Sequence, residues 1–144
     1  MQRLLEEGGP EALCVAGGLP EPTVRHRQYA GYKAQRKPMR EDLAAQMRGL
    51  KRVLEEMGVR RLEAAGWEAD DILGTAAKKC AAAGWGCEIV TGDRDSFQLI
   101  GGAAAVRFVK SRMGREETAL YDTARFEEAY GFAPPLMVDL KALM

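Results

Sequence analysis

The chain is 144 residues long, with 47% hydrophobic and 29% charged residues and with 21 basic and 21 acidic side chains. This composition is typical of one globular domain, covering residues 1–144, and argues against a disordered chain. The N-terminus lacks the apolar stretch of a secretory signal, and no apolar run approaches membrane-spanning length, so we expect no membrane partner. The three cysteines are odd in number and lack metal-ligand spacing, which predicts reduced thiols in a cytoplasmic protein.

Strands and helices are predicted to alternate along the chain. In order, the patterns predict a strand at 12–16, an exposed and partly helical basic segment at 22–40, a helix at 41–57, a strand at 60–64, a helix at 68–83, a strand at 86–92, a short helix at 95–100, paired strands at 105–110 and 118–121, a helix at 122–131 and a last helix from 134. This alternation predicts an α/β fold with a mainly parallel sheet covered on both faces.

Two acidic motifs follow predicted strands. The first contains Glu68, Asp70 and Asp71, and the second contains Asp93 and Asp95. Each acid alone is explained by its helix start, because carboxylates there complement the helix dipole. Asp95, with Gln98 three residues later, also has the form of a capping box.

The two motifs together favour a ligand site, because ligands of parallel sheets gather at the carboxyl ends of the strands. If the strand ends are neighbours, two carboxylates about 4 Å apart repel by about 4 kcal/mol at an effective dielectric of 20. A cation or raised pKa values must relieve that repulsion. Ligands that are all oxygen suit Mg²⁺ or Mn²⁺, and such clusters can hold two metal ions that act on a phosphodiester.

The basic segment 22–40 has six basic residues and no acidic one. Tyr29 and Tyr32 lie between the cations, so the segment can neutralise phosphates and offer faces for base stacking. A solvated basic loop explains the same composition, and both interpretations stay open. His26 is the only histidine, and we interpret it as one more polar group of this loop.

Four segments resemble, in order and spacing, the bacterial 5′-nuclease family, which includes the 5′→3′ exonuclease domain of DNA polymerase I and the flap endonucleases. They are TVRHRQYAGYKAQR (23–36), GWEADDIL (66–73), IVTGDRDSFQLI (89–100) and the closing DLKALM. The resemblance implies a PIN-like three-layer domain with a mainly parallel central sheet and a basic helical arch. It also implies two divalent metal ions, hydrolysis of DNA at 5′ ends or 5′ flaps, and a C-terminal polymerase domain as partner in the parent protein.

The resemblance assigns a role to each matching residue. The metal ligands would be the two acidic motifs, Glu68, Asp70, Asp71, Asp93 and Asp95. Lys33 and Arg36 would lie at the base of the arch and bind the scissile phosphate. The path of the DNA strand would be lined by Arg25, Tyr29 and Lys37.

The chain also departs from the family pattern. The family's second-strand Asp falls at Gly18, with Gly17 in place of the preceding Phe and Val24 in place of the Phe before Arg-His. An Asp on the family's first strand has no counterpart. After DLKALM the family continues into GDxSDN and a helix–hairpin–helix region. We therefore expect a fragment whose two-metal site is partly missing its ligands.

Two other functions fit some of these features. A non-catalytic DNA-binding remnant of the same family would keep the basic arch without a working metal set, and Gly18 favours it. A phosphorelay receiver is loosely matched by Asp70-Asp71, Asp93 and Lys110. The receiver is disfavoured because its paired acids follow the first strand, whereas here they open a helix in mid-chain.

Overall fold

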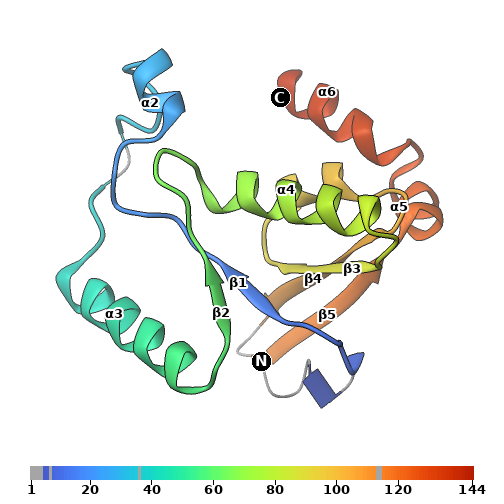
Figure 1. Cartoon of the computed structure of the whole chain (residues 1–144). Coiled ribbons are helices and arrows are strands. Elements are labelled where there is room, and N and C mark those ends of the chain that lie inside the picture. Colours follow the sequence, from blue (N-terminus) through green and yellow to red (C-terminus); the bar gives the residue numbers. More distant parts are fainter. Residues whose placement is uncertain (1–4, 7, 36, 113–114) are drawn as a thin grey trace. The chain divides into compact units, whose positions relative to one another are not determined.

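The computed structural model describes residues 5–6, 8–35, 37–112 and 115–144. The chain forms two compact units, Met1–Ile72 and Leu73–Met144, whose elements are labelled in Figure 1. Among the described residues, no helix combines the length and the apolar character needed to cross a membrane.

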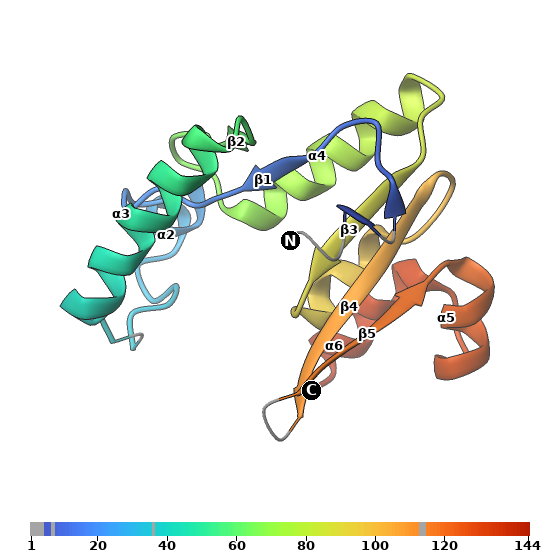
Figure 2. The same ribbon diagram turned by 90° about the horizontal axis from the view of Figure 1, so that it is seen from below.

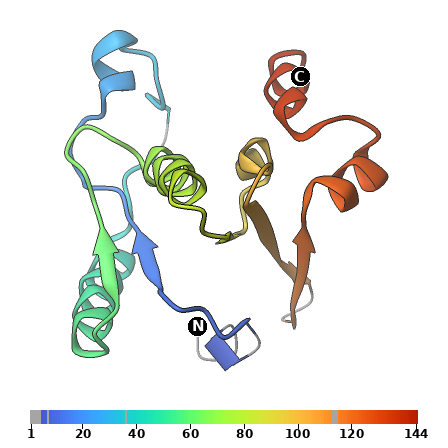
Figure 3. The same ribbon diagram turned by 45° about the vertical axis from the view of Figure 1, so that its right-hand side comes forward.

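The first unit contains a two-stranded parallel sheet. Strand β1 (Cys14–Ala16) pairs with β2 (Arg60–Leu62), with Cys14 opposite Arg60 and Ala16 opposite Leu62. Helices α2 (Val24–Gln28) and α3 (Glu41–Glu56) lie between these strands in the sequence, and α3 contacts β2. Figure 3 shows the two parallel arrows with α3 beside them.

Helix α3 carries its apolar residues at helical spacing, as the sequence predicts. Acidic Glu41 and Asp42 occupy its first turn, where they complement the helix dipole, and Gly58 follows its end with a φ of 70°. Among the described residues of the first unit, Leu54 alone is a buried hydrophobic residue. The other apolar residues at this helical spacing are between 39% and 55% exposed: Leu43, Met47, Leu50, Val53 and Met57.

The second unit contains a three-stranded mixed sheet. Helix α4 (Ala69–Ala82) begins in the first unit and continues into the second. The remaining elements are β3 (Cys87–Thr91), the 3₁₀ helix η1 (Arg94–Leu99), β4 (Ala104–Arg112), β5 (Arg115–Tyr121), α5 (Thr123–Tyr130), the 3₁₀ helix η2 (Pro134–Leu136) and α6 (Met137–Ala142). Strand β4 lies between β3, to which it is parallel, and β5, to which it is antiparallel (Figure 2).

The second unit has an aromatic core centred on Phe97 of η1. The Phe97 side chain is fully buried, and its ring centroid lies between 5.0 and 5.6 Å from those of Phe108, Tyr121, Phe126 and Tyr130. Tilted and edge-to-face arrangements of this kind are favourable for aromatic rings. The core therefore fixes η1, which begins after Asp93 and contains Asp95 of the second acidic motif, against the sheet and α5.

The mixed α/β class predicted from the sequence is confirmed. The described strands, however, form two small sheets, where the alternation predicted a single one. The paired strands in the second half are longer than predicted, and their turn at 113–114 lies outside the described residues. Helix α5 begins and ends as predicted, with Asp122 accepting a 2.8 Å hydrogen bond from the Arg125 N–H and with Gly131 at a φ of 79°.

Candidate metal and nucleic-acid site

The first acidic motif lies at the start of α4. The Asp71 side chain accepts a hydrogen bond from the Glu68 backbone N–H at 3.0 Å, and the Asp71 N–H donates to the Glu68 carbonyl at 3.1 Å. This reciprocal pairing closes the first turn and satisfies a donor that the helix start would leave without a partner. Asp71 therefore has a helix-capping function in addition to its charge.

Basic side chains from the segment 22–40 bind this motif directly. Arg25 donates to both carboxylate oxygens of Asp71, from Nη1 to Oδ2 and from Nη2 to Oδ1, each at 2.7 Å. Lys33 Nζ donates to Glu68 Oε1 at 2.8 Å, and the Tyr32 hydroxyl donates to Glu68 Oε2 at 3.0 Å. Arg25 Nη1 also lies 3.8 Å from Glu68 Oε2. Two acids and two bases thus form one cluster within the first unit.

The pKa values in this cluster favour charged side chains. The hydrogen bond from Arg25 holds the pKa of Asp71 below its ordinary value, and the same bond raises the pKa of Arg25. For Glu68, burial is the largest influence and favours the neutral form, but hydrogen bonds from Lys33 and Tyr32 and nearby positive charge outweigh it, so the pKa falls. The bond to Glu68 raises the pKa of Lys33. The cluster is therefore a set of ion pairs.

Local structure in the basic segment explains how these cations reach α4. The Val24 N–H donates to the Gly66 carbonyl at 2.8 Å, which ties the start of α2 to the residues before α4. Thr23 precedes α2, and its backbone N–H donates to His26 Nδ1 at 3.2 Å. His26 is therefore part of the helix start, a function that the sequence interpretation missed although Thr-x-x-His has the spacing of a cap.

Lys33 occupies an unusual backbone conformation. Its φ is 54°, and among the described residues other than glycine it alone has a positive φ. A residue with a Cβ rarely adopts this conformation. The Lys33 ammonium lies 5.0 Å from the centre of the Tyr32 ring, and the Tyr32 ring contacts His26 edge-on at 5.2 Å. The strained backbone of Lys33 thus occurs together with contacts of its side chain to Glu68 and Tyr32.

The other predicted DNA-binding residues are less constrained. Tyr29 is 69% exposed and Lys37 is exposed, whereas Arg36 lies outside the described residues. Asp70 is exposed at the start of α4. Trp67, between Gly66 and Glu68, is 49% exposed.

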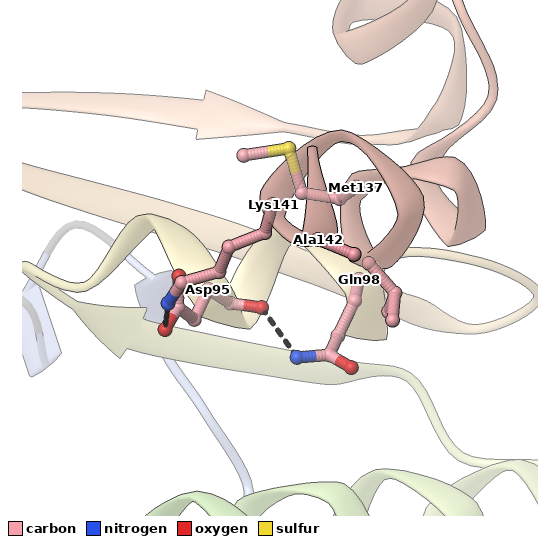
Figure 4. A pocket seen from close by; sticks show the side chains of 6 residues that line it. Asp95, Gln98, Met137, Lys141 and Ala142 are labelled. Atoms are coloured by element: carbon pink, nitrogen blue, oxygen red, sulfur yellow. Dashed lines mark hydrogen bonds and ion pairs between the residues drawn. The ribbon is translucent and has the colours of Figure 1, made fainter. Parts of the chain in front are cut away.

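The second acidic motif follows β3. Asp93, not Asp95, caps η1: its Oδ1 accepts a 2.9 Å hydrogen bond from the Asp95 N–H. A capping box would require the Gln98 side-chain oxygen to accept from the Asp95 N–H. The predicted capping box is therefore wrong in detail, because the Asp95 N–H donates to Asp93 and Gln98 Nε2 donates to the Asp95 carbonyl, at 2.9 Å. The Asp95 carboxylate forms an ion pair with Lys141 of α6 (Figure 4).

A cavity of about 260 Å³ lies beside this ion pair. Figure 4 shows the side chains around it, and its lining is formed by Asp95, Gln98, Met137, Val138, Lys141 and Ala142. Lys141 was not predicted as a contact of the acidic motif, because 46 residues separate it from Asp95 and no local pattern links them.

The two acidic motifs have the donor atoms that a divalent metal ion prefers, but in neither motif do the described side chains form a metal-binding group. The donors are carboxylate oxygens, which Mg²⁺ prefers. Among the described residues, however, no group of three or more His, Cys, Asp or Glu side chains is placed to hold a metal ion. Glu68, Asp71 and Asp95 each bind a basic side chain of the chain itself. The two motifs belong to different units, so the predicted convergence of all five carboxylates stays a prediction.

These features define a mixed α/β protein in which a basic segment is paired with an acidic helix start. Residues 1–131 match the family described as the 5′-3′ exonuclease, N-terminal resolvase-like domain. The chain belongs to this family.

Similar proteins agree with this assignment. Over 141 residues the chain is 39% identical to the thermostable DNA polymerase I of Thermus filiformis, and this match covers 98% of the chain and 16% of the relative. It is 31% identical to the DNA polymerase I of Bacillus subtilis over 144 residues, again 16% of the relative. The chain thus spans about a sixth of the length of these relatives.

Solved structures show the same fold. The bacteriophage T5 5′-exonuclease with bound zinc ions matches with a TM-score of 0.69 and 19% identity over 98% of this chain and 54% of that chain. A T5 flap endonuclease complex with DNA and metal ions matches with the same TM-score and 17% identity, over 99% of this chain and 54% of the other.

Proposed function

We propose that the chain is the N-terminal part of a 5′→3′ exonuclease or flap endonuclease domain that hydrolyses DNA phosphodiester bonds with divalent metal ions. The parent protein would be a repair and replication protein of the DNA polymerase I type, working in the bacterial cytoplasm on DNA with 5′ ends or flaps. One observation carries the proposal. In a chain of the exonuclease family, Lys33 of the basic segment contacts Glu68 of the first acidic motif across 35 residues of sequence.

The proposed metal ligands are the carboxylates of the two acidic motifs. They would hold Mg²⁺ or Mn²⁺, since every donor is an oxygen: Glu68, Asp70, Asp71, Asp93 and Asp95. A bound pair of metal ions supplies an activated water and stabilises the leaving oxygen. The proposal requires that the two motifs meet at one metal site, and that further residues, beyond these five, complete the coordination of the metal ions.

The proposed DNA contacts come from the basic segment. Lys33 and Arg36 would bind the scissile phosphate and offset the charge that develops on it. The strand would run along Arg25, Tyr29 and Lys37, and the exposure of Tyr29 and Lys37 supports such a path. In fold, the chain would supply much of a single PIN-like three-layer domain with a mainly parallel central sheet, for which the T5 structures are the support.

A chimaera tests this function. The segment of Thermus filiformis DNA polymerase I that matches this chain is replaced by residues 1–144, and cleavage of 5′-flap DNA is measured with Mg²⁺ and with EDTA. We expect Mg²⁺-dependent cleavage that Lys33→Ala lowers by roughly a hundredfold, the scale of losing one preorganised charge-stabilising donor. Arg27→Ala in the same segment is the matched control. An inactive chimaera, or one indifferent to Lys33→Ala, would contradict the proposal.

A second candidate function is non-catalytic DNA binding. Gly18 favours it, because no carboxylate stands at that position, and so do the ion pairs that already occupy Glu68 and Asp71. This function predicts DNA affinity that falls steeply with salt, does not respond to Mg²⁺ and leads to no cleavage by the chimaera. Affinity that is flat across salt concentrations would exclude it.

A further inference from the structure

The carboxylates of Glu68 and Asp71 are occupied by donors of the same chain. Asp71 accepts three hydrogen bonds, two from Arg25 and one from the Glu68 backbone. A carboxylate offers about four lone-pair positions, so little capacity is left for a metal ion. Both oxygens of Glu68 also accept, one from Lys33 and the other from Tyr32.

These contacts also hold the basic segment in place. Helix α2 has five residues, which is too short to be stable alone, and the described residues 29–35 form turns without regular structure. Lys33 keeps a positive φ, a conformation that is unfavourable for a residue with a Cβ. The ion pair between Lys33 and Glu68, together with the contact of Lys33 with the Tyr32 ring, is positioned to offset that strain.

We propose that Arg25 and Lys33 are internal counter-ions of the first acidic motif: they bind Asp71 and Glu68 in the metal-free chain, and a divalent cation that binds these carboxylates releases them. We call this set of contacts the latch, formed by Arg25, Tyr32 and Lys33 on one side and Glu68 and Asp71 on the other. The released guanidinium and ammonium groups then become available to a DNA phosphate. The roles of metal and phosphate rest on the proposed function, whereas the latch itself does not.

The latch couples two binding events. Asp71 has little capacity for a metal ion while Arg25 takes two of its lone-pair positions, so the guanidinium and the metal compete for this carboxylate. Because the metal frees the basic side chains for phosphate, binding of metal and binding of phosphate favour each other. This coupling is reciprocal: if the metal increases phosphate affinity by some factor, phosphate increases metal affinity by the same factor. The cluster also stays charge-balanced throughout, because a divalent ion replaces two monovalent cations.

Limited trypsin digestion of the metal-free chain tests the latch directly. Glu68→Gln and Asp71→Asn each remove one acceptor charge, and we expect cleavage after Arg25 and Lys33 to accelerate about three- to tenfold, as for the loss of one partly exposed ion pair. Glu21→Gln removes a charge from an exposed side chain nearby and should leave the rate unchanged. Because Asp71 also caps α4, the exchanged pair Arg25→Asp with Asp71→Arg provides a rescue. The exchange removes the cleavage site at residue 25, so the rescue is measured at Lys33, where most of the protection should return. Unchanged cleavage in Glu68→Gln and Asp71→Asn would overturn the proposal.

Mn²⁺ binding tests the competition. The free Mn²⁺ signal in electron paramagnetic resonance is titrated with the wild-type chain and with Arg25→Gln, Lys33→Gln and Arg27→Gln. We expect Arg25→Gln and Lys33→Gln to bind Mn²⁺ about three- to tenfold more tightly than Arg27→Gln, which removes the same charge from the same segment without touching the acids. Equal affinities in the three variants, or no Mn²⁺ bound by any of them, would overturn the competition.

The trypsin digestion and the cleavage assay on the chimaera together separate the inference from the proposed function. A chimaera that cleaves flap DNA, together with unchanged trypsin digestion of Glu68→Gln and Asp71→Asn, would keep the nuclease function and remove the latch. Accelerated digestion together with an inactive chimaera would keep the latch and remove the nuclease function.

Discussion

Gly18 has open space where a side chain would stand. Apart from its two chain neighbours, no residue has a heavy atom within 4 Å of a Cβ built there, and its φ is not positive, so neither packing nor backbone requires a glycine. Gly17 differs, because a Cβ at that position would lie 3.0 Å from Glu63 Oε1. The two neighbouring glycines therefore differ in the room that they offer a side chain: Gly18 has it, whereas at Gly17 the Glu63 side chain must shift.

Gly18→Asp is expected to keep the stability of the chain within about 0.5 kcal/mol, as for an exposed site without special contacts. It would place a carboxylate where the sequence resemblance puts the family's second-strand Asp, and we expect tighter Mn²⁺ binding by the chain. Thermal unfolding and Mn²⁺ titration measure the two effects. Gly17→Asp serves as control and should lower the unfolding temperature without a gain in Mn²⁺ affinity. Unchanged Mn²⁺ affinity in Gly18→Asp would contradict the assignment of this position.

Glu63 gives a pH-dependent prediction in the first unit. Its pKa is lowered chiefly by the hydrogen bond from Lys51, whose Nζ lies 2.6 Å from Oε1, with Arg61 adding positive charge. A carboxyl with a lowered folded pKa stabilises the fold above its ordinary pKa of 4.5 and loses that contribution as the pH falls through the folded value. Between neutral pH and about pH 3, Glu63→Gln should therefore lose less stability than the wild type. Urea unfolding across this range measures the difference, and a variant with the wild-type pH profile would refute the contribution.

Among the elements, helix α5 shows what local sequence determines. Asp122 and Gly131 stand at its two ends in the sequence, and the structure uses both as caps. Such signals act over three or four residues, so the sequence predicts them well. The pairing of strands joins residues far apart in the chain, and local patterns did not reveal that β1 and β2 form a sheet separate from β3, β4 and β5.

The same distinction applies to the candidate site. The acidic motifs and the basic segment are visible in the sequence as short runs, and their residue types indicate a metal and a phosphate ligand. The ion pairs that connect Arg25 with Asp71 and Lys141 with Asp95 each span 46 residues, and only the folded chain shows them. The choice between Asp93 and Asp95 as the cap of η1 depends on backbone direction after β3, which the sequence did not decide.

The cap of α5 gives a prediction for this element. Asp122→Ala removes the acceptor of the Arg125 N–H and should lower the free energy of unfolding by about 1 kcal/mol, the usual cost of losing an N-cap. Asp122→Asn is the matched control, because its side-chain oxygen can still accept this bond, and it should lose only part of that stability. Denaturant unfolding of the three proteins measures the difference, provided that the free energy of unfolding depends on denaturant concentration with the same slope in each. Equal stability of Asp122→Ala and the wild type would show that the cap contributes nothing.

At the scale of the whole molecule, buried apolar side chains are distributed unevenly. The second unit holds the cluster around Phe97, Val106 and Phe126, all fully buried, whereas Leu54 is the buried hydrophobic residue described in the first unit. Regions with few buried apolar contacts open at lower free energy than a packed core. The two units should therefore differ in local stability.

Hydrogen exchange of the intact chain tests this difference. We expect backbone amides of β4 to exchange more slowly than those of β1 and β2, because β4 is the central strand beside the aromatic core. Phe97→Ala should narrow the gap by accelerating exchange in β4, since it leaves a cavity in that core. Equal protection of β1 and β4 in the wild type would contradict the expectation.

Trp67 and Trp85 stand one in each unit, and each is about half exposed, at 49% and 54%. Because the chain has two tryptophans, replacing either with phenylalanine leaves a single emitter in a known half of the sequence. The Trp85→Phe protein would fluoresce from the residue directly before Glu68, so its emission wavelength reports the solvent around the acidic helix start. The chain thus carries built-in optical probes with which unfolding, metal titration and DNA binding can be followed separately in each half.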